Sequence, residues 1–332
     1  MRVSVVVPAL IRDAEDRENL DRCVTAVCLA EPAPDEVVVV DDGSPVAISL
    51  TTPGAVPVRV LRQDNAGPAA ARNAGAQASS GEIVVFVDAD IVVPADAFER
   101  ITAGFVASPE VVAIWGTVTA AHAHRGLVSR YKNLTHRHFT LQQEEKTRHL
   151  TTMLAAVRRD AFERVGGFDT RLKTVSVEDV ELGRSLHEAG GIVRLDIALA
   201  AEHRHRFTLF GAVRNDFHKA RRMASSTLRR RLAGEDAVSV RSSGERRQIH
   251  YLLGVPLGAG AVAAALAGRW RASAALTGAM LLWERDLVGY LASQQGWIFT
   301  AACVPLMALE RANVACAVTV GVVDVARGKL VG

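Results

Sequence analysis

The sequence predicts an α/β protein built on a parallel sheet with helices on both faces. Valine-rich runs at 3–7, 37–40 and 83–87 are apolar except for Ser4, which is typical of strands buried on both faces of a sheet. Segments with helical spacing of apolar residues separate these runs, as in repeated βαβ units. At 332 residues the chain exceeds the usual size of one domain, so we expect a main domain and an appended part.

Each expected strand is a short run rich in β-branched residues, the composition typical of buried strands. Pro8 is expected to end the first run, because proline lacks the amide hydrogen that a central strand donates. In order along the chain, we expect strands at 3–8, 36–40, 58–61, 83–87, 111–119 and 192–201.

The expected helices lie between the strands, where apolar residues recur every three or four positions opposite a charged face. Gly67-Pro68 suits a helix start, and Gly190-Gly191 suits a helix end. The polar, histidine-rich segment 122–149 is expected to be a mobile loop. In order, we expect helices at 13–30, 66–79, 94–107, 159–165 and 177–189.

Composition narrows the class of protein. With 39 basic and 36 acidic residues, the net charge of +3 is too small to indicate a nucleic-acid partner. Four cysteines (Cys23, Cys28, Cys303, Cys316) lack the spacing of metal ligands, and their apolar surroundings indicate reduced, buried thiols. The apolar run 3–11 is too short for a secretory signal, so we expect the N-terminal part to lie in the cytosol.

Carboxylates follow two of the expected strands. Asp41-Asp42-Gly43-Ser44 comes after the second, and Asp88-Ala89-Asp90 comes after the run 83–87. The carboxyl ends of strands face the ligand crevice of an α/β sheet, so these side chains would project there. Two carboxylates can hold a divalent cation that neutralises substrate phosphates. The alternative is an acidic turn that closes a strand.

Five motifs in one order resemble the family 2 glycosyltransferases, which have the GT-A fold. The resemblance covers about residues 3–210 and implies a Rossmann-like nucleotide-sugar-binding domain over 1–210. The motifs are Asp41-Asp42-Gly43-Ser44, Asn65-Ala66-Gly67 with Arg72-Asn73-Ala74-Gly75, Asp88-Ala89-Asp90 (the DXD motif), Gly166-Gly167-Phe168-Asp169, and Glu178-Asp179.

The resemblance implies roles for residues on the donor side. Asp42 would contact the base, Asp88 the ribose, and Asp90 with His203 would hold Mg²⁺ or Mn²⁺. The alternatives are a strand-closing turn for Asp42, a solvated helix charge for Arg72 and a structural role for His203. The implied nucleotide-sugar contacts are Pro8, Ala9, Asp42, Arg72, Asp88, Ala89 and Gly167.

One departure concerns the first strand. The family usually continues it into an aromatic residue or asparagine, whereas here Pro8 leads to Ala9-Leu10-Ile11, which leaves the choice of base open.

On the acceptor side, the resemblance implies that Asp179 is the general base of an inverting transfer. Glu178 would orient a loop or touch the acceptor. The alternative for both is an ordinary pair of acids at a helix start, which the helix macrodipole favours. The Gln-x-x-Arg-Trp motif of processive members is missing from the sequence, so we expect transfer of a single sugar.

The last third of the sequence changes character. We expect a basic amphipathic connecting segment at 211–248 and an apolar helical, membrane-associated region at 249–332. Charges at 284–286 and 310–311 interrupt the apolar stretches, so spanning, in-plane and re-entrant helices stay open, as does a homo-oligomer interface.

Together these features predict a metal-dependent enzyme at the cytoplasmic face of the cell membrane. Its acceptor is expected to be a polyprenyl-linked or other glycan. The alternatives are a nucleotide-sugar-binding protein without turnover and a soluble oligomeric glycosyltransferase with a non-lipid acceptor. A sugar-phosphate nucleotidylyltransferase is disfavoured, because the segment 8–17 lacks the glycine-rich, basic loop of that class.

Overall fold

The computed structural model describes residues 1–50, 53–170, 178–232 and 243–328, with side chains for all of these except 243–253. By internal packing the chain divides into two units. The first comprises Met1–Ala123 with Glu144–His205, and the second comprises His124–Gln143 with Arg206–Val331. The second unit therefore includes residues 124–143 and 206–210 of the expected catalytic domain 1–210.

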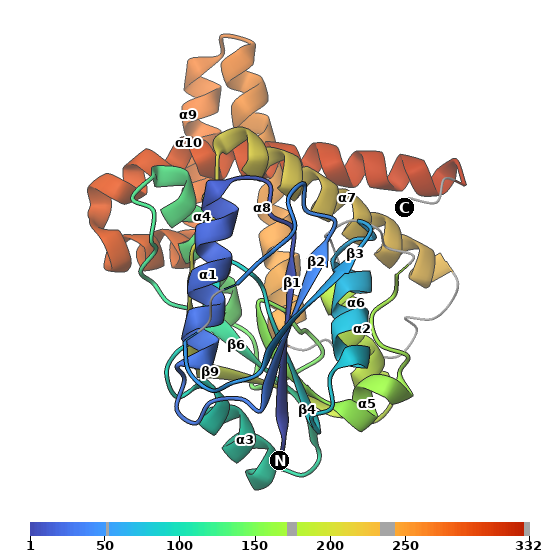
Figure 1. Ribbon diagram of the computed structural model, residues 1–332. Helices are drawn as coiled ribbons and strands as arrows, with labels where there is room; N and C mark the ends of the chain where they lie inside the picture. Colours follow the sequence, from blue (N-terminus) through green and yellow to red (C-terminus); the bar gives the residue numbers. More distant parts are fainter. Residues whose placement is uncertain (51–52, 171–177, 233–242, 329–332) are drawn as a thin grey trace. The chain divides into compact units, whose positions relative to one another are not determined.

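The first unit is built on a sheet with the strand order β3-β2-β1-β4-β8-β6-β9-β5, in which β7 pairs with β9 (Figure 1). β1, β2, β3 and β4 are parallel to one another. The described strands are β1 (Val3–Ala9), β2 (Glu36–Asp42), β3 (Val58–Gln63), β4 (Ile83–Val87), β5 (Ile91–Val92), β6 (Val111–Val118), β7 (Lys146–Thr147), β8 (Leu154–Arg158) and β9 (Ile192–His203).

The prediction of a parallel sheet holds for that half and is wrong for the other. β8 runs antiparallel between β4 and β6, so the sheet is mixed. A continuous apolar run such as 154–157 of β8 is typical of a buried strand, but nothing in its composition encodes a direction.

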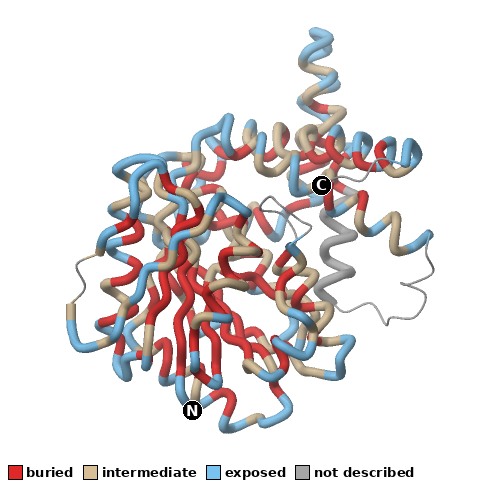
Figure 2. The backbone as a smooth tube through the Cα atoms, turned by 45° about the vertical axis from the view of Figure 1, so that its right-hand side comes forward, coloured by how far each residue is buried: buried red, intermediate tan, exposed pale blue. Residues whose placement is uncertain are grey.

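Alternating side chains of the central strands point to opposite faces of the sheet and enter two separate cores. In Figure 2 the backbone of these strands is coloured as buried. Val5 and Val7 join one core with α1 and α3, whereas Val6 joins the other with α2, α5 and α6. The predicted helices on both faces are thereby confirmed. They are α1 (Ala14–Cys28), α2 (Pro68–Ala78), α3 (Ala97–Ala107), α5 (Arg159–Arg164) and α6 (Glu178–Glu188).

Two expectations about single segments are wrong. β1 continues through Pro8 to Ala9, because its pairing with β4 ends at Val6 and beyond that point β1 pairs only with β2. The segment 122–149 is not a loop, since α4 (Leu127–Leu141) occupies most of it. Polar and aromatic side chains at helical spacing form its buried face, and their polarity hides it from a search for apolar periodicity. That face includes Tyr131, Leu134, Thr135 and His138.

The thiols also depart from expectation at one position. The four cysteines are free, and Cys23, Cys28 and Cys303 are buried as predicted, but Cys316 is exposed. It lies on the outer face of a helix whose composition is apolar all round, so composition could not identify the exposed side.

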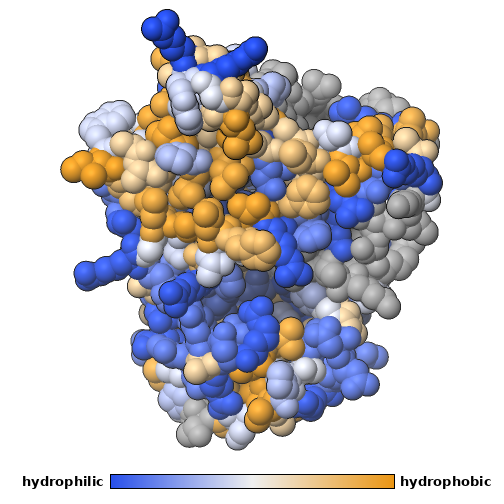
Figure 3. All heavy atoms as spheres, turned by 90° about the horizontal axis from the view of Figure 1, so that it is seen from above, coloured by the Kyte–Doolittle hydropathy of each residue, from blue (hydrophilic) through white to orange (hydrophobic). Residues whose placement is uncertain are grey.

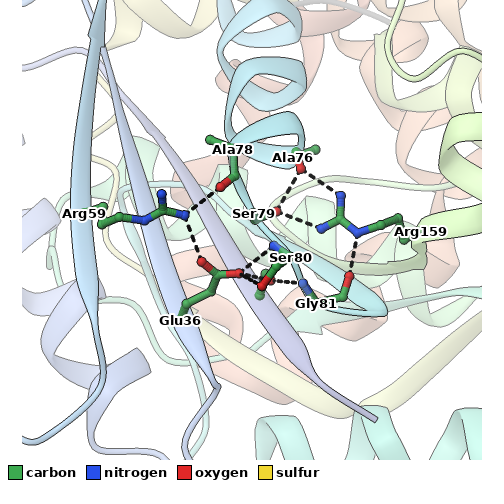
Figure 4. Close-up of polar contacts among 9 residues, drawn as sticks. Glu36, Arg59, Ala76, Ala78, Ser79, Ser80, Gly81 and Arg159 are labelled. Carbon is green, nitrogen blue, oxygen red and sulfur yellow. Dashed lines mark hydrogen bonds and ion pairs between the residues drawn. The ribbon is translucent and has the colours of Figure 1, made fainter.

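A polar cluster ties the amino-terminal ends of the strands together (Figure 4). Glu36 accepts hydrogen bonds from Ser4 Oγ at 2.8 Å, Ser80 N at 2.6 Å and Arg59 Nη2 at 2.9 Å. Burial raises the pKa of Glu36, but these hydrogen bonds outweigh it and lower the pKa to about 2. Arg159 donates to Ala76 O at 2.8 Å and to Gly81 O at 2.5 Å. Structural contacts thus occupy the amino-terminal end of the sheet, and we look for ligand-binding residues at the carboxyl ends of the strands.

The second unit is helical. Its described helices are α4, α7 (Leu209–Leu232), α8 (Ser243–Leu266), α9 (Trp270–Trp283) and α10 (Arg285–Ala326), the last interrupted at Gly296, where φ is +80°. Within the described ranges, α10 is the one helix long and apolar enough to cross a bilayer. Length and composition alone are weak evidence for such a role, because core helices of soluble proteins share both.

Candidate functional site

The carboxyl ends of β1, β2 and β4 and the end of β9 carry the candidate site of the first unit. The structure places the predicted residues in two groups and leaves others apart. One group is Arg72 with Asp88 and Glu178, and the second is Asp90 with His203. Asp42, Gly167 and Asp179 belong to neither group.

Arg72 joins two carboxylates that are far apart in the sequence. Its Nη2 donates to Asp88 Oδ1 at 2.8 Å and its Nη1 to Glu178 Oε1 at 3.1 Å. The Arg72 side chain is 5% exposed, which excludes the alternative of a solvated helix charge. Its guanidinium carbon also lies 5.5 Å from the ring centre of Phe168. Arg72 thus links the end of β4 to the first residue of α6.

Asp88 is held beside a second acid. Burial raises the pKa of Asp88, and the nearby charge of Asp90 adds to that rise, so the attraction of Arg72 offsets only part of it. Two neighbouring carboxylates with an arginine on one side form a site where added positive charge is favourable.

Asp90 lies against two histidines of the β9 end. Its Oδ2 is 3.8 Å from His203 Nε2 and 3.4 Å from His205 Nδ1. The pairing of Ile91 with His203 and the hydrogen bond from Arg204 N to Asp90 O, 2.8 Å, bring the two segments together. Burial raises the pKa of Asp90, but the hydrogen bond from His205 and the charge of His203 outweigh it, so the net shift is downward.

The donor set around Asp90 fits a divalent cation. Two ligands that share Mg²⁺ at about 2.1 Å each can lie at most about 4.2 Å apart, and the 3.8 Å between Asp90 and His203 satisfies that limit. Among the residues with described side chains, no group of three or more His, Cys, Asp or Glu is arranged to hold a metal. A cation here would therefore complete its coordination with water or substrate phosphate, as Mg²⁺ commonly does.

Asp42 is 5% exposed, and three protein donors occupy its carboxylate. Oδ1 accepts from Gln63 Nε2 at 2.7 Å and from Ala66 N at 2.8 Å, and Oδ2 accepts from Gly67 N at 3.0 Å. Asp42 thereby anchors the turn that precedes α2. Its predicted contact with the base stays a prediction.

The strand-closing turn belongs to the preceding residue. Asp41 Oδ1 accepts from Ser44 N at 2.9 Å, and Ser44 Oγ accepts from Ile11 N at 2.9 Å. Burial raises the pKa of Asp41, but hydrogen bonds from Ser44 and Ile48 and the charge of Arg62 bring it below its usual value. These contacts fix the segment that follows Pro8 and Ala9, the last two residues of β1, against the end of β2.

The glycine pair before Phe168 is positioned by Asn73. Asn73 Nδ2 donates to Phe168 O and Asn73 Oδ1 accepts from Phe168 N, both at 2.9 Å. Gly167 has φ +72°, and a Cβ there would lie 2.7 Å from Asn73 Oδ1, so glycine is required by both conformation and space. Asn73 thus sets the geometry of a loop predicted to approach the donor.

Glu178 and Asp179 diverge at the start of α6, as expected for neighbours on a helix. Glu178 points inward and is 3% exposed, whereas Asp179 is partly exposed, and its Oδ1 accepts from Val180 N at 2.8 Å. The expected loop before α6 lies partly in 171–177, outside the described residues. Ala89 is partly buried and packs against the core between the two aspartates.

Several contacts of the site escaped prediction from the sequence, although Asn73 itself belongs to the motif Arg72-Asn73-Ala74-Gly75. Asn73 follows Arg72 on α2, Gln63 ends β3, and His205 alternates with His203 at the end of β9. The alternation of His203 and His205 is a detectable signal, because residues two apart on an extended segment share a face. The roles of Asn73 and Gln63 depend on residues distant in sequence and leave no local signal.

The chain is similar in sequence to known glycosyltransferases. Residues 4–166 match the family model described as glycosyl transferase family 2. A pre-mycofactocin glycosyltransferase of Mycobacterium tuberculosis is 30% identical over 217 residues, which cover 62% of this chain and 43% of that protein. An undecaprenyl-phosphate 4-deoxy-4-formamido-L-arabinose transferase of Serratia proteamaculans is 32% identical over 106 residues, covering 30% of this chain and 32% of that protein. The chain thus spans less than half the length of either curated relative.

A solved structure agrees with the architecture. The mannosyltransferase from Pyrobaculum calidifontis, in complex with GDP-Man and Mn²⁺, matches with a TM-score of 0.53 at 19% identity. The match covers 99% of this chain and 88% of that one. At this identity the likeness shows the fold, and it confirms the predicted GT-A architecture.

Proposed function

We propose that this protein, whose residues 4–166 belong to glycosyl transferase family 2, transfers one sugar from a nucleotide-sugar donor to an acceptor hydroxyl or phosphate. The observation that carries the proposal is the meeting of two acidic segments at one buried arginine. Arg72 contacts Asp88 beside the metal candidate Asp90, and it contacts Glu178 beside the base candidate Asp179. Through these two contacts Arg72 would hold the proposed donor and acceptor residues in a fixed arrangement.

On the donor side, Asp90 and His203 are the residues that would hold a divalent cation. When bound, Mg²⁺ or Mn²⁺ supplies the charge that stabilises a departing nucleoside diphosphate. Asp88 would meet the ribose, and the turn held by Asp42 would border the base. The hydrogen bond from His205 lowers the pKa of Asp90 and would orient its carboxylate.

On the acceptor side, Asp179 would act as the general base. A partly exposed carboxylate can accept the proton of an acceptor hydroxyl as the oxygen attacks the anomeric carbon from the face opposite the leaving group. Attack from that face inverts the configuration. Glu178 would position α6 through Arg72 and leave proton transfer to Asp179.

The proposed acceptor is lipid-linked and is met at the cytoplasmic face of the membrane. Two observations support this part: the apolar helices of the second unit, and a relative named as an undecaprenyl-phosphate sugar transferase. The basic residues of α7 suit an anionic headgroup surface, where each contributes about 1 kcal/mol.

The test is a panel of nucleotide sugars incubated with the full chain in detergent, with and without a polyprenyl phosphate. Release of nucleoside diphosphate is measured with Mg²⁺, with Mn²⁺ and with chelator. We expect one donor to give metal-dependent release that the Asp179→Asn variant loses. Donor binding without release in every combination would instead identify a binding protein.

A further inference from the structure

Arg12 is an exposed arginine immediately before α1, in the segment that joins β1 to that helix. Its side chain is 64% exposed, and its guanidinium forms a fork with Asp16, in which Nε donates to Oδ2 at 2.8 Å and Nη2 donates to Oδ1 at 3.1 Å. Hydrophilic side chains predominate in the lower half of Figure 3, where the first unit is seen, so an exposed charge there indicates no function by itself. Arg12 differs from other surface arginines in the position of its partner.

The face of α1 that carries Asp16 lies against the candidate site. Residues three or four positions apart share a face of a helix, so Asn19 and Cys23 continue the row that Asp16 begins. Asn19 Oδ1 accepts from Arg204 Nε at 3.3 Å, and Cys23 Sγ donates to Asp88 O at 3.5 Å. This row is thus attached to the ends of both β4 and β9.

The charges of Arg12 and of the Asp90 group act on each other. The pKa of Arg12 is raised, mainly by its hydrogen bond with Asp16 and in part by the charge of Asp90. The hydrogen bond with Asp90 raises the pKa of His205, while burial and the charge of Arg12 oppose that rise. Charges that perturb one another in this way lie close together, so the Arg12 guanidinium borders the cation site proposed at Asp90 and His203.

Arg12 is held less firmly than the two other arginines of this region. Arg72 and Arg204 have partners on other strands and helices, and their side chains are only 5% and 16% exposed. Arg12 is paired with an acid four positions along the chain, and an exposed ion pair of this kind contributes little to stability. Its guanidinium can therefore exchange Asp16 for a stronger ligand at little cost.

The proposed reaction leaves negative charge beside this arginine. A divalent cation that is ligated by the Asp90 carboxylate retains a single net positive charge, whereas a departing nucleoside diphosphate carries more negative charge than that. Arginine donates two parallel N–H groups to a phosphate in the same fork geometry that it uses for a carboxylate. The fork of Arg12 that now holds Asp16 is therefore the fork that a phosphate would need.

We propose that Arg12 binds the diphosphate of the nucleotide donor, and that it does so by exchanging the Asp16 carboxylate for phosphate oxygens. Asp16 is then an internal competitor, because it holds the guanidinium and also repels the incoming anion. The two side chains therefore have opposite effects on affinity: Arg12 strengthens the binding of a nucleoside diphosphate, and Asp16 weakens it. The inference rests on the function proposed above and adds a phosphate-binding residue to it.

The first test replaces the arginine. Binding of UDP, GDP, ADP and dTDP to the full chain in detergent is measured by calorimetry, with Mg²⁺ and with chelator, and the tightest of the four is used for the variants. Arg12→Met should weaken this binding by about tenfold or more, the usual contribution of hydrogen bonds between charged groups. Arg22→Met, which breaks an exposed ion pair with Glu18 on the same helix, is the matched control and should bind normally.

The second test replaces the competing acid. Asp16→Asn should tighten the binding of the same nucleoside diphosphate by a few-fold, because it removes the competing carboxylate and leaves Arg12 in place. Most of this gain should disappear when Asp16→Asn is combined with Arg12→Met. Asp21→Asn, which removes the acidic partner of Arg17 on the same helix, is the matched control and should bind normally.

A third measurement distinguishes the donor from a lipid-linked acceptor as the source of the phosphate. A polyprenyl phosphate is titrated into the unsubstituted chain and into Arg12→Met under the same conditions. Its binding should be the same in both proteins, because Arg12 is assigned to the nucleotide. Loss of polyprenyl phosphate binding in Arg12→Met, with normal binding of the nucleoside diphosphate, overturns that assignment.

Two results separate failure of this inference from failure of the proposed function. Nucleoside diphosphate affinity that is equal in Arg12→Met and in the unsubstituted chain overturns the inference alone. The absence of binding of all four nucleoside diphosphates to the unsubstituted chain overturns the proposed function and the inference with it. An affinity of Asp16→Asn at or below that of the unsubstituted chain overturns the competition between Asp16 and the phosphate.

Discussion

Arg72 and Glu178 lie 106 positions apart in the sequence and meet at 3.1 Å, with both side chains at most 5% exposed. A buried ion pair of this kind contributes little net stability, but losing one partner is costly. Its value here is geometric, because it attaches the first turn of α6 to the helix that follows β3.

Replacing Arg72 tests that attachment. Arg72→Met leaves Asp88 and Glu178 close together without a counter-charge, so we expect a loss of about 3–5 kcal/mol in the free energy of unfolding. Arg72→Lys keeps the charge but cannot donate to both acids in a fork, and should lose less. Urea denaturation measures the free energy of unfolding of the unsubstituted chain, Arg72→Met and Arg72→Lys. Equal stability of Arg72→Met and the unsubstituted chain would contradict the proposed role.

Asp90 is predicted to support donor binding through the cation. Asp90→Ala should remove the metal-dependent part of donor affinity, because it deletes the carboxylate beside His203. Calorimetric titration with and without chelator measures the effect. Asp96→Ala, which removes a half-exposed carboxylate paired with Arg100 at the start of α3, is the matched control and should bind normally. Unchanged, metal-dependent affinity in Asp90→Ala would exclude Asp90 as a ligand.

Asp179→Asn should bind donor normally and lower kcat by about 10²–10⁴-fold, the usual contribution of a positioned general base. The amide is of similar shape but cannot accept the proton. Glu181→Gln, two residues along the same helix, provides the control and should stay within a few-fold. A rate for Asp179→Asn close to that control would mean that another residue is the base.

The two neighbouring glycines separate conformational strain from crowding. Both have positive φ, +81° at Gly166 and +72° at Gly167, so alanine at either should cost about 1–2 kcal/mol. Only at Gly167 would the new Cβ also approach Asn73 Oδ1, at 2.7 Å, whereas at Gly166 it meets open space. In thermal unfolding, Gly167→Ala should therefore have a lower melting temperature than Gly166→Ala. Equal melting temperatures would show that the Asn73 side chain moves aside without cost, and the reverse order would contradict the prediction.

Glu36 predicts a pH dependence of stability. Its pKa falls from 4.5 to about 2 on folding, so its contribution is complete above pH 4.5 and disappears as the pH falls towards 2. Glu36→Gln should be less stable at pH 7 by about 1–3 kcal/mol, and the difference should shrink through this window. Urea titrations at pH 7, 5, 4 and 3 measure this difference in the free energy of unfolding. Glu82→Gln, with a side chain 61% exposed, should show no such trend.

Much of the first unit could be derived from local patterns. Strands such as 83–87 and helices such as 66–79 appear within a few residues of their predicted bounds, because side-chain periodicity is a property of short segments. The acids at strand ends were also identifiable, since a change from apolar to acidic residues is visible locally. His203 was found with Asp90 through the resemblance to a family, and the β5–β9 pairing supplies the physical reason for their contact.

The amino-acid sequence alone established most of the longer elements of the first unit, the acidic ends of β2 and β4 and the apolar character of the C-terminal third. The tertiary structure alone decided the direction of β8, the helix α4 within a polar segment, the burial of Arg72 between two acids and the pairing of charges inside α10. Each of these depends on which distant groups become neighbours. The charged side chain of an arginine or glutamate without a partner is more stable in water than inside the protein. Only a partner of opposite charge that folding brings close makes its burial favourable.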